Sequence, residues 1–342
     1  MIFKKRGREV RWAGEIIELS WTYRMSRLVQ VACGTGIFER LGEGPAAAAA
    51  IARTLKLDAK MVEKLLIPLA AMGLVRRSGR AWQLTPKARA TLVSASPCYQ
   101  GNTLAHSAQV SSFWNDLESA VRGRKPALSA AEGGAWRFVE AEGGPPIRSH
   151  RDFILAMHNM AMAGRAAELA DRIDLRGRRT LMDIGGGPGS YAMALCERNP
   201  GLTATVFDLP ETIKIAREVV ARPGMADRVR TVRGDWDEDE FGSGNDAVLM
   251  SSILHGPTSG AEVKLRKARR SLVPGGLLII QDFLMNDRRT GPLIPALFNV
   301  MVGAFSETEL VERIAAAGFA RIRLIAMPTA AGTTLVTAVR PR

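Results

Sequence analysis

The feature that most constrains the fold is a glycine-rich turn, GGGPG at 185–189, between two runs of strand-forming residues. An apolar run over 181–184, which includes Asp183, leads into the turn. A helix-compatible stretch then leads to a β-rich run over 203–207 that ends at Asp208. Glycines let a ligand approach the backbone, and an acid at the end of the second strand accepts hydrogen bonds from ribose hydroxyls. The segment therefore predicts a βαβ unit that binds a nucleotide-type ligand at the carboxyl edge of a parallel sheet.

The residues of the turn narrow the class of ligand. No lysine lies between Asp183 and Arg198, which argues against a phosphate-binding loop of the Gly-Lys-Ser/Thr type. The dinucleotide fingerprint G-x-G-x-x-G does not fit, because Gly189 follows Gly187 one residue too early. The carboxylate of Asp183 would repel a pyrophosphate but suits an ammonium group. A ribose and an amino-acid ammonium together describe S-adenosylmethionine, and a purely structural turn is the alternative.

The chain after residue 180 alternates strands and helices, which predicts an α/β fold with a parallel sheet. Seven strands are expected in this part of the chain, at 180–184, 203–207, 228–232, 246–250, 276–281, 320–325 and 333–338.

The motif D-x-G-G-G-x-G at 183–189 resembles that of the class I S-adenosylmethionine-dependent methyltransferases. Within that class, the chain from about Glu15 onward resembles the small-molecule O-methyltransferases of plant phenolic and bacterial secondary metabolism. The family also has tetrapyrrole- and carotenoid-pathway members. The resemblance implies a Rossmann-like, seven-stranded sheet with an antiparallel edge. It also implies S-adenosyl-L-methionine as the methyl donor and S-adenosyl-L-homocysteine as the product.

Residues 1–95 are expected to form a separate, mainly helical winged-helix domain. Helical patterns over 15–41 and 46–55, and a third that begins after Asp58, precede a β-hairpin at 74–84. A helical linker and substrate-capping region is expected at 96–175, and the S-adenosylmethionine-binding catalytic domain at 176–342.

Two functions are open for the winged-helix domain. Residues 1–95 carry 17 Lys/Arg and 7 Asp/Glu in a chain of net charge +13, which suits nucleic-acid binding. The basic side chains expected on its second helix and wing are Lys60, Lys64, Arg76, Arg77 and Arg80. The resemblance implies instead that the domain interlocks two subunits, and the fold alone does not decide between these functions. We favour a homodimer.

Cofactor-binding residues are expected at the carboxyl ends of the strands. Asp183 and the backbone of Gly185 and Gly187 would contact the amino-acid end, Asp208 the ribose and Leu209 the adenine face. By the resemblance, an acid and an apolar neighbour after the third strand contact the adenine, and a helical methionine packs near the sulfonium. With a serine directly after the fourth strand, these residues are Asp235, Trp236, Met157 and Ser251.

Among the four histidines, His255 is the candidate general base, because it follows the fourth strand at the ligand-binding edge. By the resemblance, Asp282 at the end of the fifth strand orients it. The family's histidine precedes Asp-Trp, whereas Gly256 and Pro257 follow His255, and the family's second acid is not evident in VGAF at 302–305. A loop histidine without a catalytic role is the alternative.

The acceptor pocket is expected to be broad and apolar. Its expected lining residues are Trp114, Phe153, His158, Met160, Phe298, Asn299 and Met301. For His158, a structural role between helices is the alternative.

The leading functional hypothesis is methyl transfer to a hydroxyl of an aromatic or polyketide-like small molecule, with His255 as the base. One alternative is transfer to carbon, nitrogen or sulfur, as for a tetrapyrrole or other pigment acceptor, without a base. Another is a DNA-binding regulator that senses the cofactor. Three widely spaced cysteines and the lack of a long apolar run favour a reduced, cytoplasmic protein with no metal and no membrane segment.

Overall fold

The computed structural model describes residues 7–124, 150–327 and 332–342. The chain has two compact units, Met1–Val110 and Ser111–Arg342. Among the described residues, no helix combines the length and apolar character needed to cross a bilayer.

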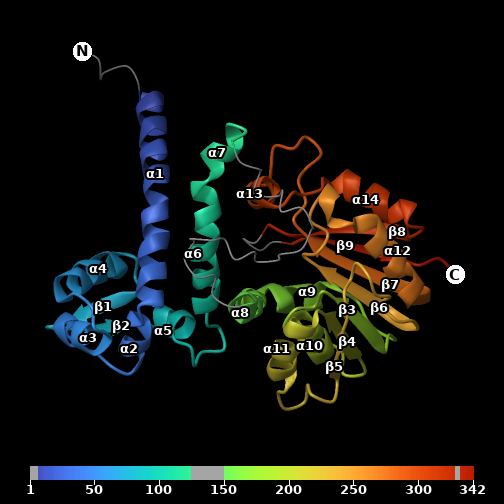
Figure 1. Ribbon diagram of the computed structural model, residues 1–342, viewed down its shortest axis with the longest axis horizontal. Coiled ribbons are helices and arrows are strands. Elements are labelled where there is room, and N and C mark those ends of the chain that lie inside the picture. The colour runs from blue at the N-terminus through green and yellow to red at the C-terminus, as the bar shows by residue number, and fades with distance from the viewer. Residues whose placement is uncertain (1–6, 125–149, 328–331) are drawn as a thin grey trace. The chain divides into compact units, whose positions relative to one another are not determined.

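The first unit has the expected helical and winged arrangement (Figure 1). Its elements are α1 (Gly7–Gly34), α2 (Ile37–Gly42), α3 (Ala48–Leu55), α4 (Ala59–Ala71), the hairpin β1 (Val75–Ser78) and β2 (Ala81–Leu84), and α5 (Pro86–Leu92); α6 (Gly101–Asn115) begins in this unit. Side chains that are fully or almost fully buried form one core: Phe38, Leu41, Ile51, Leu66, Leu69 and Trp82.

The prediction of a single helix over 15–41 is wrong, because two helices, α1 and α2, cover this range. The chain turns at Gly36, whose φ of 79° lies outside helical space, and this glycine separates α1 from α2. The hairpin that forms the wing is confirmed, with Val75 opposite Leu84 and Ser78 opposite Ala81.

The second unit is built on a seven-stranded sheet, as the strand pattern predicts. Its strands are β3 (Thr180–Ile184), β4 (Thr203–Asp208), β5 (Val229–Arg233), β6 (Asn245–Ser251), β7 (Leu272–Asp282), β8 (Ala320–Ala326) and β9 (Thr334–Val339). The order is β5-β4-β3-β6-β7-β9-β8. The first five strands are parallel and the last two pairings are antiparallel, so the expected antiparallel edge is confirmed.

Helices cover both faces of this sheet (Figure 1). The first face packs against α8 (His150–Met160), α9 (Ala166–Arg172), α10 (Ser190–Arg198) and α11 (Pro210–Val220). The second packs against α12 (Ala261–Ser271) and α14 (Glu307–Ala316). Leu181 points into the first core and its neighbour Met182 into the second, as the two-residue period of a strand requires. The unit also contains α7 (Leu117–Val121), a π-helical turn at Ala161–Arg165, a 3₁₀ turn at Pro257–Ser259, and α13 (Leu293–Met301).

Candidate active site

Four of the expected site residues lie where parallel strands end. Asp183 is the fourth of the five residues of β3, and the other three are the last residues of β4, β6 and β7, namely Asp208, Ser251 and Asp282. Parallel neighbours present their carboxyl ends at one edge of the sheet, which is where ligands bind in open α/β folds. The edge therefore brings together residues that are up to about 100 positions apart in the sequence.

The glycine turn after β3 is shaped by close packing. The backbone of Gly185 has a φ of 61°, and an added Cβ would lie 2.5 Å from the Trp236 ring and 2.9 Å from Ile253. Only glycine fits at this position, because both the backbone conformation and the space exclude a side chain. The Trp236 indole thus packs directly against the turn, and the two segments form one wall.

The carboxylate of Asp183 is buried without a hydrogen-bond partner. Its side chain is 1% exposed, and neither of its oxygens is paired within the described part of the chain. Burial and, to a smaller extent, the charge of Asp208 raise the pKa of Asp183 to about 8, although the amide of Ala192 opposes the shift. Buried polar groups are almost always paired. An orphaned carboxylate at a ligand-binding edge is therefore suited to a cationic ligand.

Asp208 closes the glycine turn from the neighbouring strand. Its Oδ2 accepts a hydrogen bond from the Gly187 amide at 2.8 Å, and its Oδ1 accepts one from the Leu209 amide at 2.7 Å. Burial raises the pKa of Asp208, and these two amides and the Thr212 hydroxyl oppose the shift. A carboxylate has about four acceptor positions, so these three donors leave one that can accept from a ribose hydroxyl.

An open hollow of about 440 Å³ lies beside this carboxylate. It is lined by Leu209, Pro210, Arg233, Gly234, Asp235 and Asp239. Two of these, Leu209 and Asp235, were expected at the adenine. Asp239 was not expected at this site. Its Oδ2 accepts a hydrogen bond from the Asp235 amide at 2.8 Å and so fixes the turn that contains Asp235.

His255 and Asp282 form a hydrogen-bonded pair. Nδ1 of His255 lies 2.9 Å from Oδ1 of Asp282, and the imidazole is 14% exposed. Because a carboxylate only accepts, Nδ1 carries the hydrogen and Nε2 is the nitrogen that takes up a proton. Burial lowers the pKa of His255, but the charge of Asp282, its hydrogen bond and the backbone of Ser252 outweigh burial, and the pKa is raised.

Backbone amides hold Asp282 in place. Its Oδ2 accepts from the amide of Leu254 at 3.0 Å, and its Oδ1 accepts from that of Phe283 at 2.8 Å. The carboxylate is 1% exposed, so it cannot rotate away from the imidazole without leaving these donors unpaired. This arrangement orients the ring of His255.

The segment after His255 lies against the chain at 303–304. Gly256 has a φ of 63°, and an added Cβ would lie 2.9 Å from the amide nitrogen of Ala304. The aspartate that the family has at the position of Gly256 could not be accommodated here. In this backbone, both the φ of residue 256 and its contact with Ala304 require a glycine.

Two phenylalanines stack beside the imidazole. The rings of Phe283 and Phe298 are 3.7 Å apart at 13°, and their centroids lie 6.2 Å and 6.1 Å from that of His255. Phe298 was expected to line the acceptor pocket. Phe283 was missed, although its place directly after Asp282 at the end of β7 was a usable signal.

His158 is bonded at both ring nitrogens. Nδ1 lies 2.7 Å from the Ser190 hydroxyl and Nε2 lies 3.1 Å from the Arg222 guanidinium. Burial and the charge of Arg222 lower the pKa of His158 to about 4, so the ring is neutral near pH 7. These contacts join α8 to the start of α10, which agrees with the structural alternative for this residue.

The other expected residues are spread over several elements. Trp114, Met157, Met160 and Met301 are half-buried, on α6, α8 and α13, and Phe153 packs against the core of the first face. Two further expected residues, Asn299 and Ser251, make side-chain hydrogen bonds. Asn299 Oδ1 accepts from the amide of Ala304 at 3.2 Å, and the Ser251 hydroxyl donates to Gln281 at 3.2 Å.

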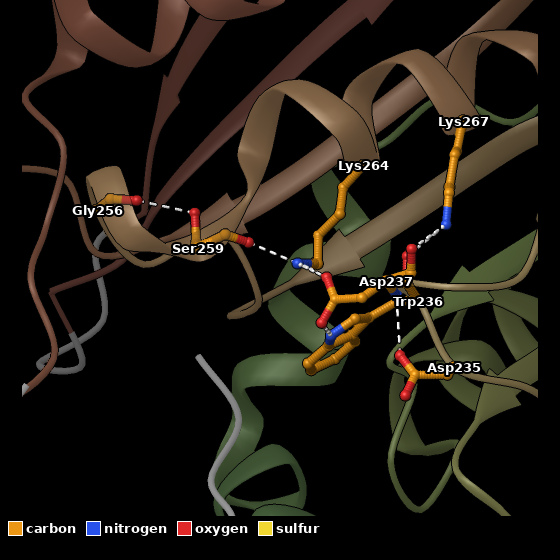
Figure 2. Close-up of polar contacts among 7 residues, drawn as sticks. All are labelled: Asp235, Trp236, Asp237, Gly256, Ser259, Lys264 and Lys267. Atoms are coloured by element: carbon orange, nitrogen blue, oxygen red, sulfur yellow. Dashed lines mark hydrogen bonds and ion pairs between the residues drawn. The ribbon is translucent and has the colours of Figure 1, made fainter. Parts of the chain in front are cut away.

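Two inward-facing lysines, Lys264 and Lys267 on α12, were also missed. Lys264 donates to Asp237, and Lys267 donates to the carbonyl oxygens of Trp236 and Asp237 (Figure 2). Lys264 occupies the same helical stripe as the buried residues Ala261, Leu265 and Ala268, at spacings of three and four. That spacing was a signal for burial.

The residues at this edge fit S-adenosylmethionine. The unpaired carboxylate of Asp183 matches an ammonium group, and at Gly187 an added Cβ would meet nothing within 4 Å, so the turn is open to a ligand. The hollow beside Leu209 has room for an adenine. The ends of the cofactor thus have matching chemistry along one edge of the sheet.

Comparisons with known proteins point to one family. Residues 114–320 match the model of an O-methyltransferase domain, and residues 17–94 match that of an O-methyltransferase dimerisation domain. The 3-hydroxy-5-methyl-1-naphthoate 3-O-methyltransferase of Streptomyces sahachiroi is 30% identical over 323 residues, which cover 92% of each chain. The N,N-dimethyltransferase OxyT of Streptomyces rimosus is 28% identical and covers 97% of this chain and 98% of its own.

Solved structures show the same fold. Human N-acetylserotonin methyltransferase in complex with S-adenosylmethionine has a TM-score of 0.82 at 22% identity, over 99% of both chains. The structure of PigF with S-adenosylhomocysteine has a TM-score of 0.77 at 24% identity, over 95% of this chain and 99% of PigF.

Proposed function

Since the chain belongs to the S-adenosylmethionine-dependent O-methyltransferase family, we propose that it methylates a hydroxyl of an aromatic small molecule with His255 as the general base. The observation that carries the proposal is the pair of His255 and Asp282, 2.9 Å apart beside two stacked phenylalanines. Nε2 of His255 takes the hydroxyl proton, and the carboxylate of Asp282 stabilises the resulting imidazolium.

The cofactor, when bound, supplies a methyl group on a sulfonium. Asp183 would pair with its ammonium, Asp208 would accept from its ribose, and Asp235 and Trp236 would hold its adenine. These residues would fix the donor, and the acceptor oxygen must then lie at near-attack distance from the methyl group. Positioning of this kind lowers a barrier by about 7–11 kcal/mol in the best models.

The stacked pair of Phe283 and Phe298 supports a planar, aromatic acceptor. Aromatic rings prefer offset-stacked or edge-to-face neighbours, and such contacts contribute about 0.5–1.5 kcal/mol beyond the burial of area. The naphthoate in the name of the Streptomyces sahachiroi relative belongs to this class of molecule, and a hydroxynaphthoate is therefore the first acceptor to test.

The substitution His255→Gln tests the assignment of the base. We expect turnover of a hydroxynaphthoate to fall by at least about 100-fold. S-adenosylhomocysteine should still bind in calorimetry, because among the described residues the imidazole contacts Asp282, Phe283 and Phe298 rather than the cofactor-binding residues named above. Unchanged turnover would refute the role of His255 as the base, because the hydroxyl would then be methylated without it.

We also propose that α1 mediates a homodimer. Its side chains are exposed over most of its length, and among its residues only Ala32 is buried. The large apolar side chains on its surface are Val10, Trp12, Ile16, Ile17, Leu19, Trp21, Tyr23 and Met25. Apolar surface of this extent marks an interface, and the dimerisation model covers α1 from residue 17 onward.

A further inference from the structure

The helix α12 places two ammonium groups inside the second unit. Lys264 is 3% exposed and Lys267 is 5% exposed. A buried charge is costly unless it is paired and hydrogen-bonded. Both ammonium groups have such partners. The contacts of the two amines show which segments they hold.

The amine of Lys264 lies between two segments that border the site (Figure 2). It donates to Oδ1 of Asp237 at 2.7 Å and to the carbonyl oxygen of Ser259. It also lies 5.2 Å from the centroid of the Trp236 ring, which is within the range of a cation–π interaction. One charge therefore binds the segment after β5 and the segment after β6.

Each of these segments leads directly to a functional group. On the cofactor side, the indole Nε1 of Trp236 donates to Oδ2 of Asp237 at 3.0 Å, and the ring packs against Gly185. On the other side, the Ser259 hydroxyl donates to the carbonyl of Gly256, the residue after His255, at 2.8 Å. A continuous path of contacts thus runs from the adenine wall to the imidazole.

Lys267 provides a matched comparison, one turn further along the same helix. It donates to the carbonyl oxygens of Trp236 and Asp237 at 3.0 and 2.8 Å and lies 5.6 Å from the centroid of the Phe241 ring. Within the described residues, none of these contacts is to the segment 256–259. Lys267 fixes one segment, whereas Lys264 joins two.

We propose that Lys264 is a positioning residue that couples the adenosyl site to the base, so that a bound cofactor sets the placement of His255. The inference rests on the proposed roles of the Trp236 wall and of His255. Coupling between two sites is reciprocal and is commonly about 5- to 150-fold. The state of the imidazole therefore also changes the affinity for the cofactor.

The test follows His255 directly by NMR of the full chain labelled at histidine, with its signal assigned by the variant His255→Gln. In the wild type, saturating S-adenosylhomocysteine should shift the His255 titration. In Lys264→Met this response should fall by at least half, whereas Lys267→Met should keep it. Both variants should bind S-adenosylhomocysteine several-fold more weakly, because both loosen the 236–237 segment.

If the His255 titration in Lys264→Met shifts as much as in the wild type, the proposal is overturned. A direct effect of the ligand on the imidazole would then explain the shift without Lys264. If Lys264→Met does not fold, Asp237→Asn cuts the same path from a side chain that is 56% exposed. The response should fall in that variant too, and an unchanged response would refute the coupling. A wild type that does not bind S-adenosylhomocysteine would refute the proposed function itself, whereas binding without any response of His255 refutes only the coupling.

Discussion

Replacement of Asp183 by asparagine should abolish a dependence of cofactor binding on pH that the buried carboxylate imposes. Burial, the nearby charge of Asp208 and the opposing amide of Ala192 together place the pKa of Asp183 at about 8, against a usual value of 3.8. A shift of roughly four units corresponds to a cost on the order of 5 kcal/mol for ionising this group in the free enzyme. An ammonium ligand that pairs with the carboxylate offsets this cost.

The sign of the effect follows from the raised pKa. Below about pH 8 the free enzyme holds a proton on Asp183, and the cationic ligand displaces it, so binding releases about one proton. The affinity should therefore rise about tenfold per pH unit from pH 6 to 7 and level off near pH 8. The unfolded chain loses this proton near pH 4, so the same group makes the free enzyme less stable as the pH rises from about 4 to about 8.

Calorimetric titration with S-adenosylhomocysteine measures the affinity at each pH. Repeated in buffers of different ionisation enthalpy, it also measures the number of protons released on binding. Asp183→Asn should release no proton, show a flat profile and bind more weakly at pH 8. Asp171→Asn removes a surface carboxylate that pairs with Arg198 at 3.1 Å and should keep the wild-type slope. The reasoning fails if the wild-type affinity is flat between about pH 6 and 8, or if the asparagine variant keeps the slope.

Three further substitutions probe other parts of the molecule. Asp282→Asn removes the charge that raises the pKa of His255, so the acidic limb of the pH–rate profile should move to lower pH. Turnover should also fall by up to about 10⁴-fold. An acidic limb at the wild-type pH would contradict the pairing of His255 with Asp282. Gly256→Ala should lower the Tm more than Gly79→Ala. Both glycines have a positive φ (63° and 59°), but only a Cβ at residue 256 would meet a backbone atom, at 2.9 Å. Equal decreases in Tm would show that this backbone contact is unimportant for stability. Ile16→Glu places a charge on the exposed face of α1 and should convert the proposed dimer to a monomer in sedimentation velocity. A variant that sediments as a dimer would place the interface elsewhere.

The sheet and its functional edge could be predicted because local patterns determine them. Leu181 and Met182 serve opposite cores, as the period of a strand requires, and the acids Asp183, Asp208 and Asp282 stand at or next to the ends of apolar runs. Parallel order then brings these ends to one edge.

The contacts around the base could not be predicted in the same way, because they depend on segments far apart in the sequence. Lys264 stands in a helix rich in charged residues, and its partner Asp237 is 27 residues away. Phe283 and Phe298 come from β7's end and α13, and no local pattern requires their rings to stack. Tertiary packing alone sets these distances.

The altered sequence after His255 is explained by one such contact. The resemblance predicts an Asp-Trp pair after the histidine and a second acid before the Ser-x-x-Glu capping box of α14; this chain has Gly256 and Pro257 at the first place and Ala304 near the second. The structure brings the two places together, since a Cβ on Gly256 would lie 2.9 Å from the backbone of Ala304. In this backbone a side chain at position 256 has no room beside Ala304, which accounts for the absence of an aspartate there. The imidazole of His255 is hydrogen-bonded to Asp282, which backbone amides hold, and the Ser259 carbonyl in the following segment accepts from Lys264.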